Sequence, residues 1–199
     1  MTRKKGVAII LLAAGSSSRM GKSKQLIDIQ GETLLKKSIG IALQSKGLNV
    51  IVVLGANEAE HRSEIENLPV SIVSNSQWSN GMGSSVKAGL AYLLSQSPIP
   101  DAVIIMVCDQ PLLTSAHVNN LIDRYDSSGK PIIASSYSNS LGVPALFDQS
   151  MFEQLSHLEG AQGAKKIIQM HLDVTDAIDF PAGSIDLDTP EDVKRFNRN

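Results

Sequence analysis

Short apolar runs alternate along this chain with longer segments in which apolar residues recur at helical spacing. Four of the runs are rich in Val and Ile: Val7–Leu12, Val50–Leu54, Val70–Val73 and Val103–Val107. Runs of this kind are typical of strands that are covered on both faces, as in a parallel sheet. The pattern therefore predicts four buried strands.

Between these runs, three segments have the spacing of amphipathic helices. Their apolar residues are Leu35, Ile39 and Leu43, then Val86, Leu90 and Leu94, then Val118, Leu121, Ile122 and Tyr125. Strands that alternate with helices imply right-handed crossovers and a three-layer α/β/α sandwich with a mostly parallel, Rossmann-like sheet. Ligands bind beyond the carboxyl ends of such strands, so we expect functional residues directly after the apolar runs.

The second half of the chain is less regular. We predict strands over Pro131–Ser135 and Val143–Phe147 around a loop at 136–142, and a last short strand over Ile185–Leu187. The predicted helices cover Met151–Leu158 and Ala161–His171. A final helix is expected to begin at Thr189-Pro190, with Thr189 as its N-cap and acidic residues in its first turn.

Composition narrows the class of protein. The length of 199 residues favours one domain over 1–199. A formal net charge of −2 excludes a polycationic nucleic-acid binder. No apolar run approaches the ~20 residues that span a bilayer. The single cysteine, Cys108, excludes an intramolecular disulfide and fits a reducing, cytoplasmic location.

The N-terminal segment has two interpretations. The basic start before Val7–Ala14 imitates a signal peptide, but a buried strand is favoured because the segment that follows has a better explanation than a cleavage site.

That segment, Leu12-Ala13-Ala14-Gly15 followed by Ser16 to Lys24, has the features of a phosphate-binding turn. Small residues let the backbone approach a ligand, and successive N–H groups can cradle an anion. Arg19 and Lys24 add the positive charge that a triphosphate requires. The plain alternative is a surface turn with two solvated cations. A Walker P-loop is disfavoured because five residues, not four, separate Gly15 from Gly21.

Three carboxylates are candidate metal ligands. Asp109 follows the run Val103–Val107 and suits Mg²⁺, which binds through one or two carboxylates plus substrate phosphates. The alternative is that Asp109 caps a turn fixed by Pro111. Asp186 and Asp188 stand at i, i+2 on a predicted strand, which places them on one face where they favour a bound cation. Asp188 could instead cap the following helix, so both acids remain candidates.

A second candidate binding segment runs from Asn75 to Val86, before an amphipathic helix. Its backbone amides and the hydroxyls of Ser84 and Ser85 suit an anion or the edge of a base. Trp78, the single tryptophan, is expected to pack in the core rather than stack on a ligand. Weaker candidate anion sites are Gly142–Pro144 and Gly160–Lys166.

The histidines and the cysteine show no spacing typical of a metal or catalytic site. The four histidines lack metal-binding spacing and are interpreted as surface or incidental residues: His61, His117, His157 and His171. Cys108 lies inside an apolar run and is interpreted as a buried, inert thiol.

Together these motifs resemble the MobA-like nucleotidyltransferases, most closely the molybdenum cofactor cytidylyltransferases. The resemblance runs through nearly the whole chain: Leu12–Gly15 with Arg19, Gly21 and Lys24; Asn75, Trp78, Gly81-Met82 and Ser84-Ser85; Asp109-Gln110-Pro111; Gly160–Ala164; and Asp186–Asp192. Ala14 stands where guanylyl relatives usually carry glycine, which implies CTP. Two positions depart from the family pattern: Val143 replaces the histidine of Gly-His-Pro, and Ala161-Gln162 stand where an aspartate is common.

The resemblance implies a transfer of CMP from CTP to the terminal phosphate of molybdenum-molybdopterin, with Mg²⁺ or Mn²⁺ and release of pyrophosphate. Arg19 and Lys24 would hold the β- and γ-phosphates, and Asp109 with Asp186 or Asp188 would bind the metal. The implied nucleotide-binding residues are Leu12, Ala13, Ala14, Gly15, Asn80, Gly81, Ser84 and Ser85. A molybdoenzyme or its chaperone would be the protein partner. Two alternatives stay open: GTP or another phosphate acceptor such as a sugar phosphate, and a non-catalytic protein that delivers the cofactor.

Overall fold

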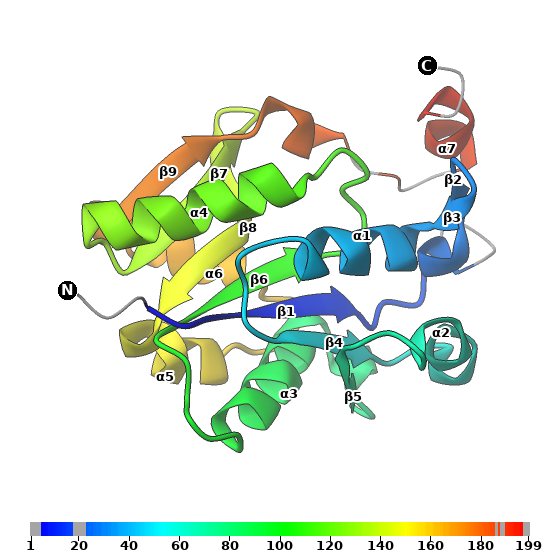
Figure 1. Ribbon diagram of the computed structural model, residues 1–199, viewed down its shortest axis with the longest axis horizontal. Helices are drawn as coiled ribbons and strands as arrows, with labels where there is room; N and C mark the ends of the chain where they lie inside the picture. The colour runs from blue at the N-terminus through cyan, green and yellow to red at the C-terminus, as the bar shows by residue number, and fades with distance from the viewer. Residues whose placement is uncertain (1–4, 18–22, 186, 188–189, 197–199) are drawn as a thin grey trace.

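A computed structural model describes residues 5–17, 23–185, 187 and 190–196. Its centre is a seven-stranded sheet in the order β5-β4-β1-β6-β8-β7-β9 (Figure 1). The parallel half contains β1 (Val7–Ala13), β4 (Val50–Leu54), β5 (Ser71–Ser74) and β6 (Ala102–Val107). In the other half, β8 (Ser140–Asp148) runs antiparallel to β6 and to β7 (Ile132–Tyr137), and β9 (Thr175–Asp179) is parallel to β7. The predicted mostly parallel sheet is therefore confirmed.

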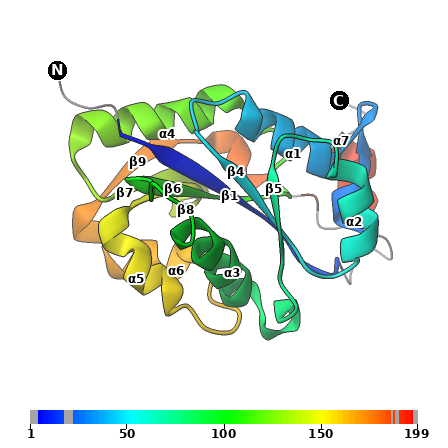
Figure 2. The ribbon, with the colours of Figure 1, turned by 60° about the horizontal axis from the view of Figure 1, so that its bottom comes forward.

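Helices cover both faces of the sheet (Figure 2). On one face lie α1 (Leu34–Leu43) and α4 (Ser115–Ser128), and on the other α3 (Met82–Leu94), α5 (Phe152–Ser156) and α6 (Ala164–Met170). Alternate residues of β1 pack into the cores on the two faces of the sheet, because successive strand side chains point to opposite sides. Ile9 and Leu11 belong to the core under α1 and α4, whereas Ile10 belongs to the core under α3. The three-layer α/β/α architecture is thus confirmed.

Smaller elements surround this frame. Helices α2 (Glu58–Ile65) and α7 (Pro190–Phe196) lie at the end of the molecule where β2 (Asp28–Ile29) pairs with β3 (Glu32–Thr33) (Figure 1). The 3₁₀ turns are η1 (Lys24–Leu26), η2 (Trp78–Asn80), η3 (Gln149–Met151), η4 (Leu172–Val174) and η5 (Pro181–Ser184). In the part of the chain that the structure describes, no helix is long and apolar enough to cross a bilayer.

Two predicted helix faces are wrong at their last position. Leu43 and Leu94 are 37% and 40% exposed, while Ala42 and Leu93 are buried in their place. A helix advances 3.6 residues per turn, so a residue seven positions along returns to the same face and one eight positions along has rotated away from it. The four-residue spacing therefore drifts off the core face after two steps.

Several strand predictions also need correction. Val70–Val73 is expected to be covered on both faces, but β5 is a half-exposed edge strand that pairs only with β4. The expected loop at 136–142 is mostly strand, because β7 and β8 meet at a two-residue turn. Both turn residues, Ser138 and Asn139, have positive φ, as a tight hairpin requires.

The chain's last predicted elements differ as well. Ile185 and Leu187 are not in a strand, and the outer strand is instead β9, which the sequence pattern did not reveal. The two predicted helices before it are shorter than expected, since α5 follows a 3₁₀ turn and α6 begins only at Ala164. Helix α7 begins at Pro190 with Glu191 and Asp192 in its first turn, as predicted. Its expected N-cap, Thr189, lies outside the described residues.

Candidate active site

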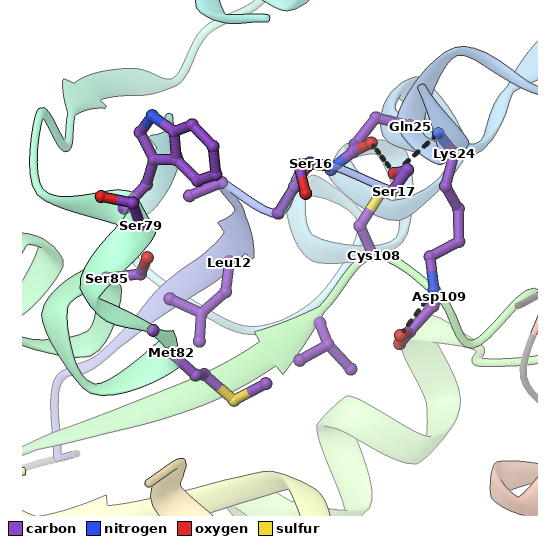
Figure 3. A pocket seen from close by; sticks show the side chains of 15 residues that line it. Leu12, Ser16, Ser17, Lys24, Gln25, Ser79, Met82, Ser85, Cys108 and Asp109 are labelled. Carbon is purple, nitrogen blue, oxygen red and sulfur yellow. Dashed lines mark hydrogen bonds and ion pairs between the residues drawn. The ribbon is translucent and has the colours of Figure 1, made fainter. Parts of the chain in front are cut away.

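A cavity of about 540 Å³ opens at the carboxyl ends of β1 and β6 (Figure 3). It is lined by three segments that are far apart in the sequence: the turn after β1 with the start of η1, the start of α3 with the turn before it, and the end of β6. The lining residues are Leu12, Ala14, Gly15, Ser16, Ser17, Lys24, Gln25, Trp78, Ser79, Gly81, Met82, Ser85, Val107, Cys108 and Asp109. This is the position expected for a ligand site in an open α/β sheet.

The turn after β1 presents backbone donors to this cavity. No described residue accepts a hydrogen bond from the N–H groups of Gly15, Ser16 or Ser17. The carbonyl groups of the same turn are occupied, because the side-chain amide of Gln25 donates to the Ala13 and Gly15 oxygens at 3.2 and 3.0 Å. Consecutive unpaired N–H groups beside a cavity suit an anion.

The part of the cavity wall formed by η1 and the end of β6 carries a pair of charges. Lys24 Nζ lies 3.1 Å from Asp109 Oδ2, with side chains 16% and 32% exposed (Figure 3). Asp109 follows the buried strand β6, and the N–H of Leu187 donates to its backbone carbonyl at 3.3 Å. Leu187 stands between the two other predicted metal ligands, Asp186 and Asp188, which lie outside the described residues. Arg19 also lies outside them.

The first turn of α3 is organised by a buried asparagine. Asn75 Nδ2 donates to Ser84 Oγ at 2.9 Å and to Ser85 Oγ at 3.0 Å. Ser85 lines the cavity, whereas Ser84 does not; the single hydroxyl proton of Ser84 has two acceptors within reach, the carbonyls of Gln77 at 2.9 Å and Gly81 at 2.8 Å. Asn80 is exposed and does not line it either. Trp78 is half-buried, packs against the core and also forms part of the cavity wall.

The glycine-rich segment around Gly160 packs against the start of α3 and does not line the cavity. The Gly83 N–H donates to the Gly160 carbonyl at 3.1 Å, and a Cβ at Gly81 would lie 2.4 Å from the same oxygen. The other weak candidate, Gly142–Pro144, is also absent from the lining among the described residues. There the Val143 carbonyl accepts hydrogen bonds from Gln110 Nε2 at 3.1 Å and from Tyr137 Oη at 3.0 Å.

Two histidines differ from their interpretation as surface residues. His61 is fully buried, and its Nε2 lies 2.5 Å from Ser23 Oγ. His117 is buried with Nε2 2.8 Å from Ser135 Oγ and its ring stacked on Phe180. Burial lowers the pKa of both imidazoles from the usual value for histidine, since it penalises the charged form.

The cysteine is buried as expected, although it reaches the cavity wall. Burial raises the pKa of the Cys108 thiol to about 12, so the thiol stays protonated at neutral pH. Among the described residues no three acids, histidines or cysteines cluster as a ready-made metal site. Asp109 is the one carboxylate in the described lining.

The sequence has relatives of similar length. A family profile described as "MobA-like NTP transferase domain" matches residues 9–175. The chain is 29% identical to the purine catabolism protein PucB of Bacillus subtilis, over 95% of each protein. It is 30% identical to the nicotine blue oxidoreductase of Paenarthrobacter nicotinovorans, over 94% of each. Among solved structures, Rv0371c of Mycobacterium tuberculosis in complex with manganese has the same fold, with a TM-score of 0.79 at 24% identity, over 98% of this chain and 99% of that one.

Proposed function

Because the chain belongs to the MobA-like NTP transferase domain family, we propose that it transfers CMP from CTP to the terminal phosphate of molybdenum-molybdopterin and releases pyrophosphate. One observation carries the proposal above all. The N–H groups of Gly15, Ser16 and Ser17, which have no acceptor among the described residues, share a cavity with Lys24 and Asp109. Donors, a cation and a carboxylate in one cavity are what a metal-bound triphosphate needs.

The reaction requires little acid–base catalysis from the protein. A terminal phosphate oxygen of the pterin attacks the α-phosphorus of CTP, the bond from that phosphorus to the β-phosphate oxygen breaks, and pyrophosphate leaves. The attacking phosphate is already ionised, so the protein needs to position two anions and neutralise their charge. The described lining, which contains no histidine, is consistent with this.

In this mechanism the turn at Gly15–Ser17 and Lys24 hold the β- and γ-phosphates, and Arg19 is proposed to join them. Lys24 and Asp109 pair with each other in the ligand-free protein. With a triphosphate and a divalent metal bound, Lys24 would pair with a phosphate and Asp109 would hold the metal. The positive charge of Lys24 and the negative charge of Asp109 are therefore positioned in the cavity before the substrate binds.

The carboxylate side of the cavity fits a divalent metal. Asp109 Oδ1 accepts no hydrogen bond from a described residue, so the carboxyl group can ligate while Oδ2 faces Lys24. Mg²⁺ is held in such sites by one or two carboxylates plus substrate phosphates, and Asp186 or Asp188 is proposed as the second carboxylate. The bound metal would polarise the α-phosphate and screen the repulsion between the two substrates. The manganese complex of Rv0371c supports a divalent ion in this fold.

The choice of CTP rests on Ala14. This residue is buried directly after β1 and is one of the residues that line the cavity, in the position where the family resemblance associates alanine with cytidine. Ser85 and Gly81 lie on the α3 side of the same cavity and are proposed to contact the base or the ribose.

A different acceptor is the leading alternative. Val143 and Ala161-Gln162 depart from the family pattern and are outside the described cavity lining, so nothing in that lining specifies a pterin. The nicotine blue oxidoreductase relative motivates a second alternative, an oxidation–reduction reaction. A carrier that delivers the cofactor to a molybdoenzyme or its chaperone would bind CTP or the pterin without turnover.

An acceptor panel tests the proposal. The protein, CTP and Mg²⁺ are incubated with molybdenum-molybdopterin, with metal-free molybdopterin or with sugar phosphates, and products are identified by mass. A CMP-pterin dinucleotide formed from the molybdenum-loaded acceptor supports the proposal. A CMP-sugar product, or oxidation of NADPH with no nucleotidyl product, would replace it by the corresponding alternative.

A further inference from the structure

One buried side chain joins Ala13, Gly15 and Ser17, at and after the end of β1, to Ser23. Gln25, at the middle of η1, is buried and makes four hydrogen bonds. Its Nε2 donates to the carbonyls of Ala13 and Gly15, and its Oε1 accepts from Ser17 Oγ at 3.0 Å and Ser23 Oγ at 2.8 Å (Figure 3 shows the Ser17 contact). All donors and acceptors of the amide are therefore satisfied.

The identity of these partners fixes the direction of the hydrogen bonds. Backbone carbonyls can only accept, so the amide nitrogen must face Ala13 and Gly15, and the amide oxygen must face the two serines. The hydroxyl protons of Ser17 and Ser23 are then both directed at Gln25. Ser17 Oγ accepts in turn from the backbone N–H of Lys24 at 2.9 Å, which links the turn to the lysine that faces Asp109.

The same proton count assigns a role to His61. Ser23 Oγ has given its one proton to Gln25, so at the 2.5 Å contact His61 Nε2 must be the donor. The imidazole is thereby protonated on Nε2. Its Nδ1 is buried with no hydrogen-bond partner among the residues that the structure describes. A histidine placed on α2 thus ends a chain of hydrogen bonds that reaches the cavity.

We propose that Gln25 and His61 are positioning residues for the triphosphate. Gln25 occupies the Ala13 and Gly15 carbonyls, so that the N–H groups of Gly15, Ser16 and Ser17 face the ligand, and His61 holds Gln25 in this orientation through Ser23. Neither residue touches the reacting atoms. This inference rests on the proposed function, because it assumes that a nucleoside triphosphate binds at this turn.

Binding of CTP in the absence of an acceptor tests the inference directly. Trp78 is the only tryptophan and lines the cavity, so its fluorescence reports on CTP binding with Mg²⁺. Gln25→Met keeps the length of the side chain but removes its hydrogen bonds, and it should weaken CTP binding about 10²-fold, as misplacement by about 1 Å does. His61→Leu should weaken it about tenfold, the size of many supporting-residue effects.

Restoring the hydrogen bond at position 61 distinguishes a positioning role of His61 from a general effect on protein stability. His61→Gln places an amide N–H where Nε2 was and should restore CTP affinity to within about twofold of wild type, whereas His61→Leu should not. His117→Leu is the matched control, since His117 is also buried and also bonds a serine, but outside the cavity lining. It should lose stability and keep the wild-type affinity for CTP.

The outcomes are distinct. Folded Gln25→Met and His61→Leu proteins that bind CTP like wild type would overturn the inference and leave the proposed function standing. If His61→Leu does not fold, Ser23→Ala removes the same link with one atom and must then weaken CTP binding. A wild-type protein that binds no nucleoside triphosphate would instead overturn the proposed function. Loss of affinity in His117→Leu equal to that in His61→Leu would show a general effect of stability and refute the positioning role.

Discussion

Lys24 and Asp109 are the residues at which charge and position matter most. Their side chains lie 3.1 Å apart on the cavity wall, with Lys24 at the start of η1 and Asp109 just beyond the end of β6. We predict that Lys24→Ala or Asp109→Ala lowers the rate of nucleotidyl transfer by at least about 10²–10³-fold, because each removes a preorganised charge from the transition state. Steady-state release of pyrophosphate measures this effect.

Another lysine–aspartate pair provides the control. Lys46 Nζ lies 2.6 Å from Asp123 Oδ1, with side chains 42% and 56% exposed and no part in the cavity. Lys46→Ala should keep the wild-type rate and change stability by less than about 1 kcal/mol, as is usual for exposed pairs. Turnover of Lys24→Ala or Asp109→Ala at the wild-type rate would remove that residue from the mechanism.

Ala14 supports a prediction about the base. Ala14→Gly removes a methyl group from the cavity wall and creates the residue associated with guanylyl transfer. We predict that the ratio of kcat/KM for CTP to that for GTP falls by about tenfold, since one methyl group is worth about 1–3 kcal/mol of discrimination. An unchanged ratio in competition assays with both nucleotides would show that Ala14 does not select the base.

Several predicted site residues lie in the cavity lining, because small, polar and charged residues directly follow the apolar runs of the sequence. Gly15, Lys24, Ser85 and Asp109 all line the cavity. Gln25 and Asn75 were not given roles, because their partners depend on how the chain folds back on itself. Ser84 and Asn80 were predicted to bind the nucleotide but do not line the cavity. A hydroxyl or amide inside a motif faces the backbone or the solvent as readily as the ligand.

At the scale of elements, the junction between α3 and the loop before α6 sets the shape of the α3 side of the cavity. Gly81 has a φ of +100° at the start of α3, and the Gly160 carbonyl lies within 2.4 Å of the position that a Cβ would occupy. Both features require glycine. The motif at Gly160, which resembled an anion site, is therefore explained by backbone packing.

Gly81→Ala tests this junction. The added methyl group must push the loop and the helix apart, so we predict a loss of about 1–3 kcal/mol in stability, together with weaker nucleotide binding. Urea unfolding and CTP titration measure the two effects.

Gly40→Ala is the control, because Gly40 lies within α1 and a Cβ there would meet no atom within 4 Å. It should leave CTP binding unchanged and stabilise the protein by about 0.5–1 kcal/mol, since alanine favours helix over glycine. Equal behaviour of the two variants would argue against the packing role of Gly81.

Two helix starts carry a clear local signal, an N-capping threonine, although a start was predicted only at Thr189-Pro190. Thr33 and Thr114 accept hydrogen bonds from the N–H groups of Lys36 and His117, and they begin α1 and α4. The hairpin turn at Ser138-Asn139 lacks glycine and could not be distinguished from a longer loop. Strand β9 lies at a sheet edge and reads Thr-Asp-Ala-Ile-Asp, without alternation of polar and apolar residues, so this short, half-exposed strand has no strong sequence signal.

At the scale of the whole molecule, two buried histidines link stability to pH. Burial lowers the pKa of both His61 and His117, so the folded protein binds fewer protons at these sites than the unfolded chain does. Their contribution to stability is complete above the unfolded pKa of about 6.5 and is lost as the pH falls below it. Wild-type stability should therefore decrease between about pH 7.5 and pH 5.5.

The double variant His61→Gln, His117→Gln tests this linkage. It retains an amide N–H for Ser23 and Ser135 but has no titratable group, so its stability should change less over the same interval. Carboxylates with lowered pKa values, such as Glu58 and Asp148, act only below about pH 4.5 and do not interfere. Identical pH dependence in the variant and the wild type would exclude the histidines as the cause.

The architecture could be predicted almost entirely, because alternation of buried strands and amphipathic helices admits few arrangements. The convergence of three segments at one cavity followed from the same rule, since carboxyl ends of parallel strands share an edge. The burial of His61 could not be predicted, because α2 carries mainly polar residues and its contact with Ser23 spans 38 positions of the sequence.

The most direct test of the account is pyrophosphate release by the wild-type protein with Mg²⁺. CTP, GTP and ATP are compared, each with and without molybdenum-molybdopterin. The account predicts release with CTP that depends on the pterin. Release of inorganic phosphate without an acceptor, or no release with any of the three nucleotides by protein that binds CTP, would contradict it.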